Sequence, residues 1–215
     1  MRLKVLYHGN CFDGCSSAAI FSRFMAETGR AKADIIEFVP LHHQQGDPFP
    51  TDAFDGDLNA CLDFRYSASP KLHWWFDHHA SAFPTPSDRA AFEKEPGDQK
   101  FWDPKAPSCT GFISRTLESR FGWTSPELKD LIHWAEIIDA ARFPTAAMAV
   151  RLQEPALRIM TLLESTKDHD VPTRIIGCLQ TMPLAEIVAQ PWFSQPLEPI
   201  LERHFKSIDT VRTAA

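Results

Sequence analysis

The chain has 215 residues, of which 44% are hydrophobic and 23% are charged, and its formal net charge is −6. This composition is typical of a globular protein with enough apolar residues for a core. No stretch approaches the roughly 18 to 20 apolar residues that a membrane span needs. The start of the chain also lacks the small-residue cleavage site of a signal peptide. We therefore expect a cytoplasmic protein without a membrane partner.

The charge balance and the cysteines exclude further classes of protein. With 22 Lys and Arg against 28 Asp and Glu, the chain lacks the excess of cations that binding to a long nucleic-acid duplex requires. The five cysteines are scattered and include no Cys-x-x-Cys pair, which argues against a disulfide framework and a zinc ribbon. Nine histidines are present, and six of them lie before residue 80. This asymmetry is the one unusual feature of the composition.

The first part of the chain alternates short apolar strands with helical sequence. A strand over 2–8 is followed by apolar residues at helical spacing from Cys15 to Thr28, which Gly29 ends. Further strands are predicted over 34–39, where Pro40 ends the run, and over 58–63 and 72–77. This order is typical of an α/β fold with a mainly parallel sheet flanked by helices.

The second part is predicted to be helical. Residues 80–107 have weak periodicity, which predicts a long loop. Helices are then expected over 108–120, with Ser108 as a cap, and from Ser125 towards Asp139. Shorter helices are expected over 156–164, 184–189 and 197–205. We predict one boundary near residue 145, between a domain over 1–145 and a helical C-terminal segment over 146–215.

Three possible metal ligands fall at the ends of predicted strands. His8 ends the first strand, Asp63 the third and Asp77 the fourth. The carboxyl ends of parallel strands form the ligand crevice of an open sheet, so these side chains should converge on one edge. Each of them alone is more often a structural hydrogen-bonding or turn-capping residue. Their convergence favours a functional site.

The fourth strand continues into the tripeptide Asp77-His78-His79. A buried carboxylate beside imidazoles is costly unless a cation or another partner compensates it. Adjacent side chains point in different directions, so one histidine can face a metal and the next a substrate. Imidazole nitrogens mixed with carboxylate oxygens suit Mn²⁺, Fe²⁺, Co²⁺ or Zn²⁺ better than Ca²⁺. The other histidines are interpreted as solvated or structural, namely His42, His43, His73, His133, His169 and His204.

Four blocks of sequence resemble the DHH phosphoesterase superfamily, which is named after the tripeptide at Asp77. The first block runs from His8 to Ala19 and combines an acidic loop with a small-residue helix start. The others are Leu62 to Ser67, Trp75 to Ala82 and Ile137 to Phe143, in the order in which the superfamily has them. The resemblance covers roughly residues 1 to 145 and implies a DHH-type phosphoesterase domain.

The resemblance also implies which residues hold metal. Asp63 would bridge two divalent cations, for which Mn²⁺ is the expected metal. Asp13, His78 and Asp139 would complete one site, and His8 would bind the other. The implied activity is hydrolysis of phosphate esters in short nucleotides or oligonucleotides.

The resemblance assigns two further residues to catalysis. Asp77 would orient His78 through a hydrogen bond, and His79 would contact the phosphate or the leaving group. The expected partners are a small phosphorylated substrate or a short single-stranded oligonucleotide. Formation of a homodimer is left open.

The first block departs from the family pattern at Cys11, where relatives usually have a second carboxylate. The site at His8 therefore has one hard ligand fewer. Cys11 can act as a softer ligand, Asn10 can contribute its side-chain oxygen, or the site can fill only when substrate phosphate is present. The number of bound ions, one or two, stays open.

The C-terminal segment is the second departure, because Gly177 is the only glycine after Pro144 and relatives carry a glycine-rich signature there. We expect a reduced or truncated substrate-binding part. A non-catalytic nucleotide- or metal-binding module on the same fold is the alternative function.

Overall fold

The computed structural model describes residues 1–32, 34–94, 97–168 and 170–214. The strands of these residues form one parallel sheet of five strands in the order β2-β1-β3-β4-β5. Their bounds are β1 Arg2–His8, β2 Ile35–Leu41, β3 Leu58–Leu62, β4 Trp74–Asp77 and β5 Lys100–Trp102. The predicted α/β class with a parallel sheet is therefore confirmed.

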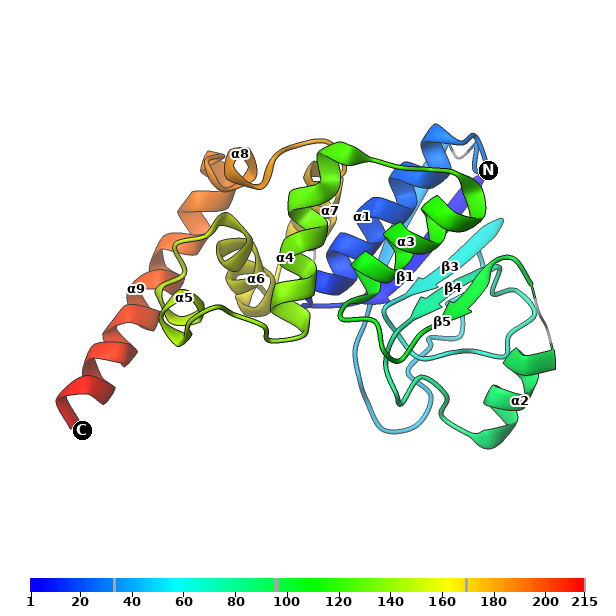
Figure 1. The fold of residues 1–215 in the computed structure, drawn as a ribbon, viewed down its shortest axis with the longest axis horizontal. Helices are drawn as coiled ribbons and strands as arrows, with labels where there is room; N and C mark the ends of the chain where they lie inside the picture. Colours follow the sequence, from blue (N-terminus) through cyan, green and yellow to red (C-terminus); the bar gives the residue numbers. More distant parts are fainter. Residues whose placement is uncertain (33, 95–96, 169, 215) are drawn as a thin grey trace.

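Helices cover one face of the sheet and then extend away from it (Figure 1). Helices α1 and α3 pack on each other, and α1 lies against β1. The helical C-terminal segment contains α5 to α9, and α9 carries the end of the chain outwards (Figure 1). The helices are α1 Phe12–Glu27, α2 Pro86–Lys94, α3 Cys109–Phe121, the 3-10 helix η1 Pro126–Leu128, α4 Lys129–Asp139, α5 Ala146–Arg151, α6 Pro155–Ser165, α7 Asp170–Leu179, α8 Leu184–Val188 and α9 Pro191–Ala214.

The strands are buried on both faces because their side chains alternate between two apolar clusters. In β4, Trp74 and Phe76 join the larger cluster under α1 and α3, whereas Trp75 joins a smaller cluster on the opposite face. The larger cluster continues through α6 and α7, where Ile159 and Ile176 are fully buried. The C-terminal helices thus share a continuous core with the sheet domain.

Several predicted elements differ from those observed. The second strand runs through Pro40 to Leu41, because β2 is an edge strand on which a missing N–H is tolerated. The loop predicted over 80–107 contains α2 and β5, whose weak periodicity reflects partial burial on one side only. Helices α5 and α7 were not predicted, and α9 is longer than the helix expected over 197–205. None of the helices in the described ranges is long and apolar enough to cross a membrane.

Asn59 is a buried polar residue of β3 that ties together the loops before β3 and β4. Its Nδ2 donates to the carbonyls of Gly56 and Lys71 at 3.1 and 3.0 Å, and its Oδ1 accepts from the Gly56 N–H at 2.9 Å. The buried side chain therefore provides hydrogen-bond partners for three backbone groups of these two loops.

Replacing Asn59 tests this role. We expect Asn59→Ala to lower the free energy of unfolding by about 2 to 3 kcal/mol, because the substitution removes three hydrogen bonds of a fully buried side chain. The measurement is urea unfolding in EDTA. Gln44→Ala is the control, since Gln44 is exposed and makes one hydrogen bond, and its effect should stay within about 0.5 kcal/mol. Equal effects of the two substitutions would contradict this account of the loops.

Candidate metal centre

The carboxyl edge of the sheet places His8, Asp63 and Asp77 at the ends of adjacent strands, as the sequence predicts. His8 ends β1, Asp63 directly follows β3 and Asp77 ends β4. Asp63 has a φ of 56°, a left-handed conformation that a non-glycine residue rarely adopts. Its N–H donates to the Phe76 carbonyl at 2.9 Å, which holds this conformation against β4. The fold thus constrains the Asp63 backbone tightly at the site.

The first turn of α1 brings Asp13 to the same edge. The helix can start this close to β1 because Gly14 has no side chain: a Cβ there would lie 2.2 Å from the His8 carbonyl oxygen. The Asp13 carboxylate accepts the N–H groups of Cys109 and Thr110 at 2.6 and 2.9 Å, at the start of α3. Asp13 therefore joins the N-termini of two helices as well as facing the site.

Asp63 lies between two imidazoles, and each of its carboxylate oxygens faces a different one. Oδ1 is 3.5 Å from His78 Nε2, and Oδ2 is 3.4 Å from His8 Nδ1. Oδ2 is also 3.8 Å from the Cys11 sulfur. The Asp63 side chain is fully buried. This arrangement allows one carboxylate to serve two neighbouring cations.

His78 belongs to a second group of donors on the α1 and α4 side of Asp63. Its Nε2 is 3.3 Å from Asp139 Oδ2 and 3.7 Å from Asp13 Oδ2. Asp139 ends α4, and its side chain is partly exposed. Donor atoms within 4.8 Å of one another form three groups, namely His8 with Cys11 and Asp63, Asp63 with His78 and His79, and Asp13 with His78 and Asp139.

Hydrogen bonds fix the orientation of both histidines of the tripeptide. The Nδ1 of His78 lies 3.0 Å from the Ala106 carbonyl, which can only accept, so Nδ1 donates and Nε2 turns to the carboxylates. The Nδ1 of His79 lies 2.7 Å from Asp77 Oδ1. Asp77 also accepts the backbone N–H groups of His78 and His79. The expectation that Asp77 orients the His78 ring is therefore wrong: Ala106 orients His78, and Asp77 orients His79.

Burial and neighbouring charges shift the pKa values of the three carboxylates. Burial, and then the charges of Asp63 and Asp139, raise the pKa of Asp13 well above its usual range. Burial and Asp63 likewise raise the pKa of Asp139. Burial opposes the charge on Asp63, but its contacts with His78 and His8 outweigh burial and lower its pKa to about 2. The cluster is therefore electrostatically unfavourable without positive charge in its midst.

The imidazole of His78 supplies part of this positive charge. Although burial disfavours its protonation, the contacts with Asp63 and the Ala106 carbonyl, together with the charge of Asp13, raise its pKa to about 10. The hydrogen bond to Asp77 raises the pKa of His79. The carboxylates therefore favour cationic neighbours throughout the cluster.

The donor set fits one or two divalent cations. His8 Nδ1, Asp63 Oδ1 and His78 Nε2 are buried atoms without a hydrogen-bond partner, and all three face the cluster. Uncompensated buried donors and acceptors are rare in proteins, and a bound ion is one explanation for them. Mixed imidazole and carboxylate ligands match the metals expected from the sequence.

Five of the predicted site residues line one cavity of about 400 Å³, whereas Asp77 and His79 line another of about 300 Å³. The lining of the larger cavity includes His8, Asn10, Cys11, Asp13 and Asp139. Asn10 has a φ of 55°, a second left-handed position beside the site. Cys11 precedes α1, and burial followed by the charge of Asp63 raises the pKa of its thiol well above the usual value. The C-terminal segment closes the cavity with Ala149, Met160 and Glu164.

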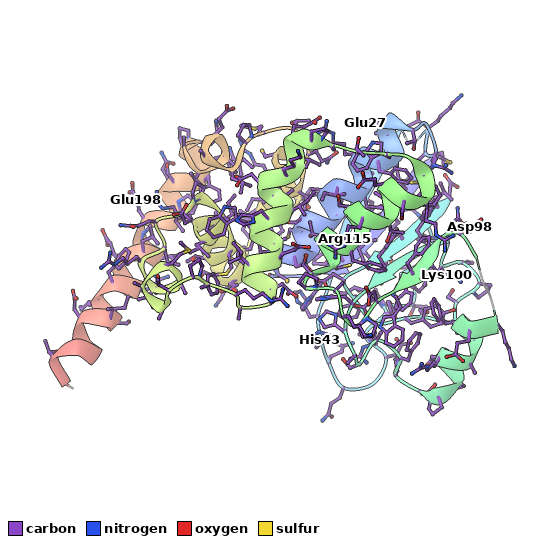
Figure 2. The ribbon with its side chains drawn as sticks, in the orientation of Figure 1. Glu27, His43, Asp98, Lys100, Arg115 and Glu198 are labelled. Atoms are coloured by element: carbon purple, nitrogen blue, oxygen red, sulfur yellow. The ribbon has the colours of Figure 1, made fainter. Side chains whose placement is uncertain are left out.

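His43 is a site neighbour that the sequence interpretation missed. The residue is exposed, as expected, but its ring stacks on Phe64 with centroids 4.9 Å apart and lies 4.9 Å from the His8 ring. Figure 2 labels His43 near the end of the sheet where α1 begins, whereas Glu27 lies at the opposite end of that helix. The order of the strands indicates where this residue lies, because the loop after β2 reaches the same edge of the sheet as the loops after β1 and β3.

The remaining histidines agree with the structural interpretation where they are described. His73 Nδ1 accepts the Asn59 N–H at 3.1 Å, and His204 Nε2 lies 2.8 Å from the Val150 carbonyl. His133 is exposed on α4. His169 lies outside the described residues.

Comparison with known proteins identifies one informative structure. No protein-family model and no curated protein matches the sequence. The fold is similar to that of a pGpG-specific phosphodiesterase, PggH from Vibrio cholerae, with a TM-score of 0.58 and 20% sequence identity. The match covers 92% of this chain and 58% of the other. The chain therefore shares its α/β fold with this phosphodiesterase, and the α/β fold expected from the sequence is confirmed.

Proposed function

We propose that the protein is a metal-dependent phosphoesterase that hydrolyses phosphodiester or phosphomonoester bonds of short nucleotides or oligonucleotides. The observation that carries the proposal is the Asp63 carboxylate, whose oxygens face His8 on one side and His78 on the other. The fold of a phosphodiesterase that acts on a small dinucleotide, pGpG, supports the same class of substrate. The preferred metal in this proposal is Mn²⁺.

The ligands divide into two sets that share Asp63. Asp13, His78 and Asp139 would complete one set, and His8 with Cys11 would complete the other. When bound there, divalent cations neutralise phosphate charge and lower the pKa of water, which supplies the nucleophile for hydrolysis. The Ala106 carbonyl keeps a proton on Nδ1 of His78, so a cation would bind at Nε2 in place of the second proton.

His79 is the proposed catalytic residue that contacts the phosphate or the leaving group. Its Nδ1 proton is held by Asp77, and its ring lines a cavity of about 300 Å³ beside the ligand cluster. The raised pKa of His79 favours the protonated ring, so that Nε2–H can donate to a phosphate oxygen. The same proton can pass to the departing alkoxide. Asp77 is then a positioning residue.

The C-terminal segment is proposed to contribute to substrate binding. Met160 and Glu164 of α6 line the 400 Å³ cavity opposite His8 and Asp13. We propose that residues 1–145 carry the metal chemistry and that residues 146–215 are a reduced substrate-binding part. We further propose that the protein acts in the cytoplasm.

The alternative is a non-catalytic nucleotide- or metal-binding module, and Cys11 is the observation that favours it. A buried thiol with a raised pKa is neutral unless a metal binds it, so the His8 set offers a single carboxylate. In that case the chain would hold one ion or none.

Measurements of metal binding can distinguish the two proposed sets of ligands. In calorimetric titrations with Mn²⁺ we expect two sites in the wild type, or one plus a second that appears with phosphate. Asp63→Asn should weaken both sites more than about 100-fold, since even residues behind the ligands contribute 10- to 100-fold. His8→Ala should weaken one site and Asp139→Ala the other. Unchanged binding of two ions by Asp63→Asn would contradict the shared carboxylate.

Hydrolysis tests the enzymatic function. We expect the wild type to cleave bis-p-nitrophenyl phosphate and dinucleotides with added Mn²⁺, and Asp63→Ala to abolish cleavage because both cations lose a ligand. His42→Ala is the matched control, with rates within about twofold of the wild type. Comparable losses in the two variants would contradict the site assignment, and a folded protein that is inactive with every divalent metal would favour the binding module.

The role of Asp77 can be measured apart from metal binding. We expect Asp77→Asn to lower kcat about 10- to 100-fold, because the amide holds the His79 ring less firmly and stabilises its protonated form less. Mn²⁺ affinity should stay within about threefold. The assays are steady-state kinetics and calorimetry on the same preparation, and a loss of Mn²⁺ affinity that parallels the loss in kcat would show that Asp77 supports the ligands instead.

A further inference from the structure

Two adjoining cavities extend from the His79 side of the metal centre across the face opposite α1. The first, of about 300 Å³, is lined by His43, Arg65, Asp77 and His79 among others. The second, of about 380 Å³, is lined by Phe49, Arg65 and Tyr66 among others, and the aspartates Asp47 and Asp88 also line it. The Asp88 carboxylate accepts hydrogen bonds from the Thr85 N–H and hydroxyl. Arg65 and Pro84 line both cavities. A molecule that reaches His79 can therefore continue past Arg65 into the second cavity.

The guanidinium of Arg65 has no anionic partner in the described ranges of the chain. Arg65 follows Asp63 by two residues, is half-buried, and lies 5.8 Å from the ring centroid of Phe64. By contrast, Arg23 and Arg115 make ion pairs with glutamates. A half-buried guanidinium offers several N–H donors in a planar fork that matches two phosphate oxygens. Its position at the junction of two cavities leaves this fork available to a ligand.

The surroundings of Arg65 in the first cavity also favour an anion. His43 and His79 line the same cavity, and Ser81 adds a hydroxyl. The Asp77 carboxylate at this cavity is already engaged by His79.

The second cavity differs in character from the first. Phe49 and Tyr66 belong to the aromatic cluster on this face of the sheet. Because Tyr66 and Pro48 are buried, the accessible apolar surface of the cavity comes mainly from the half-buried Phe49 and the exposed Pro84. Polar groups of Ser67 and Thr85 lie among them. Flat apolar walls with a few polar groups are suited to a nucleobase, which stacks through its faces and hydrogen-bonds through its edge.

We propose that Arg65 binds a phosphate of the substrate other than the one that is cleaved, and that the cavity at Phe49 and Tyr66 takes the base of the same nucleotide. The inference rests on the proposed phosphoesterase function and adds a specificity residue to it. Arg65 lies outside the metal ligands, so its contribution is to substrate affinity. The protein should accordingly prefer a dinucleotide with a terminal phosphate over one without it.

Binding to the metal-free protein tests the phosphate contact directly. In EDTA, the probes are adenosine 5′-monophosphate and adenosine, titrated at millimolar concentration and followed by calorimetry or NMR shifts. We expect the wild type to bind the monophosphate more tightly than the nucleoside, and Arg65→Gln to weaken the monophosphate about 10- to 100-fold with little change for adenosine. Arg65→Lys should recover part of the affinity. Arg120→Gln, which removes an exposed arginine of α3, should leave both affinities unchanged.

Kinetics with Mn²⁺ separates this inference from the proposed function. The substrates are a diadenosine dinucleotide with and without a 5′-phosphate, and bis-p-nitrophenyl phosphate, which has neither a second phosphate nor a base. For Arg65→Gln we expect KM to rise about 10- to 100-fold for the phosphorylated dinucleotide alone. Equal losses on all three substrates, or no preference of the wild type for the terminal phosphate, would overturn the inference while hydrolysis itself upholds the phosphoesterase.

The opposite combination of results is also informative. If the wild type hydrolyses nothing but its binding of adenosine 5′-monophosphate depends on Arg65, the phosphoesterase proposal fails and the phosphate contact is retained as part of a nucleotide-binding site. Monophosphate binding that is absent, or identical in the wild type and Arg65→Gln, overturns the inference whether or not the protein hydrolyses phosphate esters.

Discussion

The contact of the buried Asp63 carboxylate with two imidazoles is the constraint on which the rest of the centre depends. One oxygen lies near His78 and the other near His8, in a position from which water is excluded. Isolated, such a carboxylate would be strongly disfavoured, so its neighbours have to supply positive charge. The left-handed backbone at Asp63, the close start of α1 at Gly14 and the capping of α3 by Asp13 all serve to bring those neighbours to one edge of the sheet.

The candidate metal centre has two sides with different surroundings. On the α1 and α4 side, the carboxylates of Asp13 and Asp139 lie near His78 Nε2, and both residues line the cavity that the C-terminal helices also line. On the other side, His79, His43 and Arg65 line cavities that are rich in cationic and aromatic groups. The proposed metal ligands therefore lie between two different surroundings, the C-terminal helices on one side and the cavities at Arg65 on the other. The tripeptide Asp77-His78-His79 spans this division, since Ala106 turns one ring to the carboxylates and Asp77 orients the next ring.

Much of this arrangement could be predicted from sequence because it depends on local rules. Alternating apolar strands predict the parallel sheet, and the carboxyl ends of parallel strands meet at one edge, which predicts the convergence of His8, Asp63 and Asp77. The prediction that Pro40 ends the second strand is wrong, because a proline is tolerated in an edge strand and the position of β2 at the edge is a property of the whole sheet. His43 and Arg65 lie in loops whose paths depend on tertiary packing against Phe64, and no periodicity in the sequence indicates that packing. The hydrogen bond between His78 and Ala106 joins residues 28 positions apart and has no local signal either.

Anomalous diffraction from crystals soaked in Mn²⁺ tests the central claim most directly. We predict two anomalous peaks about 3.5 to 4 Å apart, each in contact with a different oxygen of Asp63. One peak should lie beside His78 and the other beside His8. A single peak in contact with Asp63 and His78, joined by a second peak beside His8 only after phosphate is added, would agree with the weaker set of ligands that contains Cys11. Peaks that do not contact Asp63, or no peak at the carboxyl edge of the sheet at all, would contradict the account.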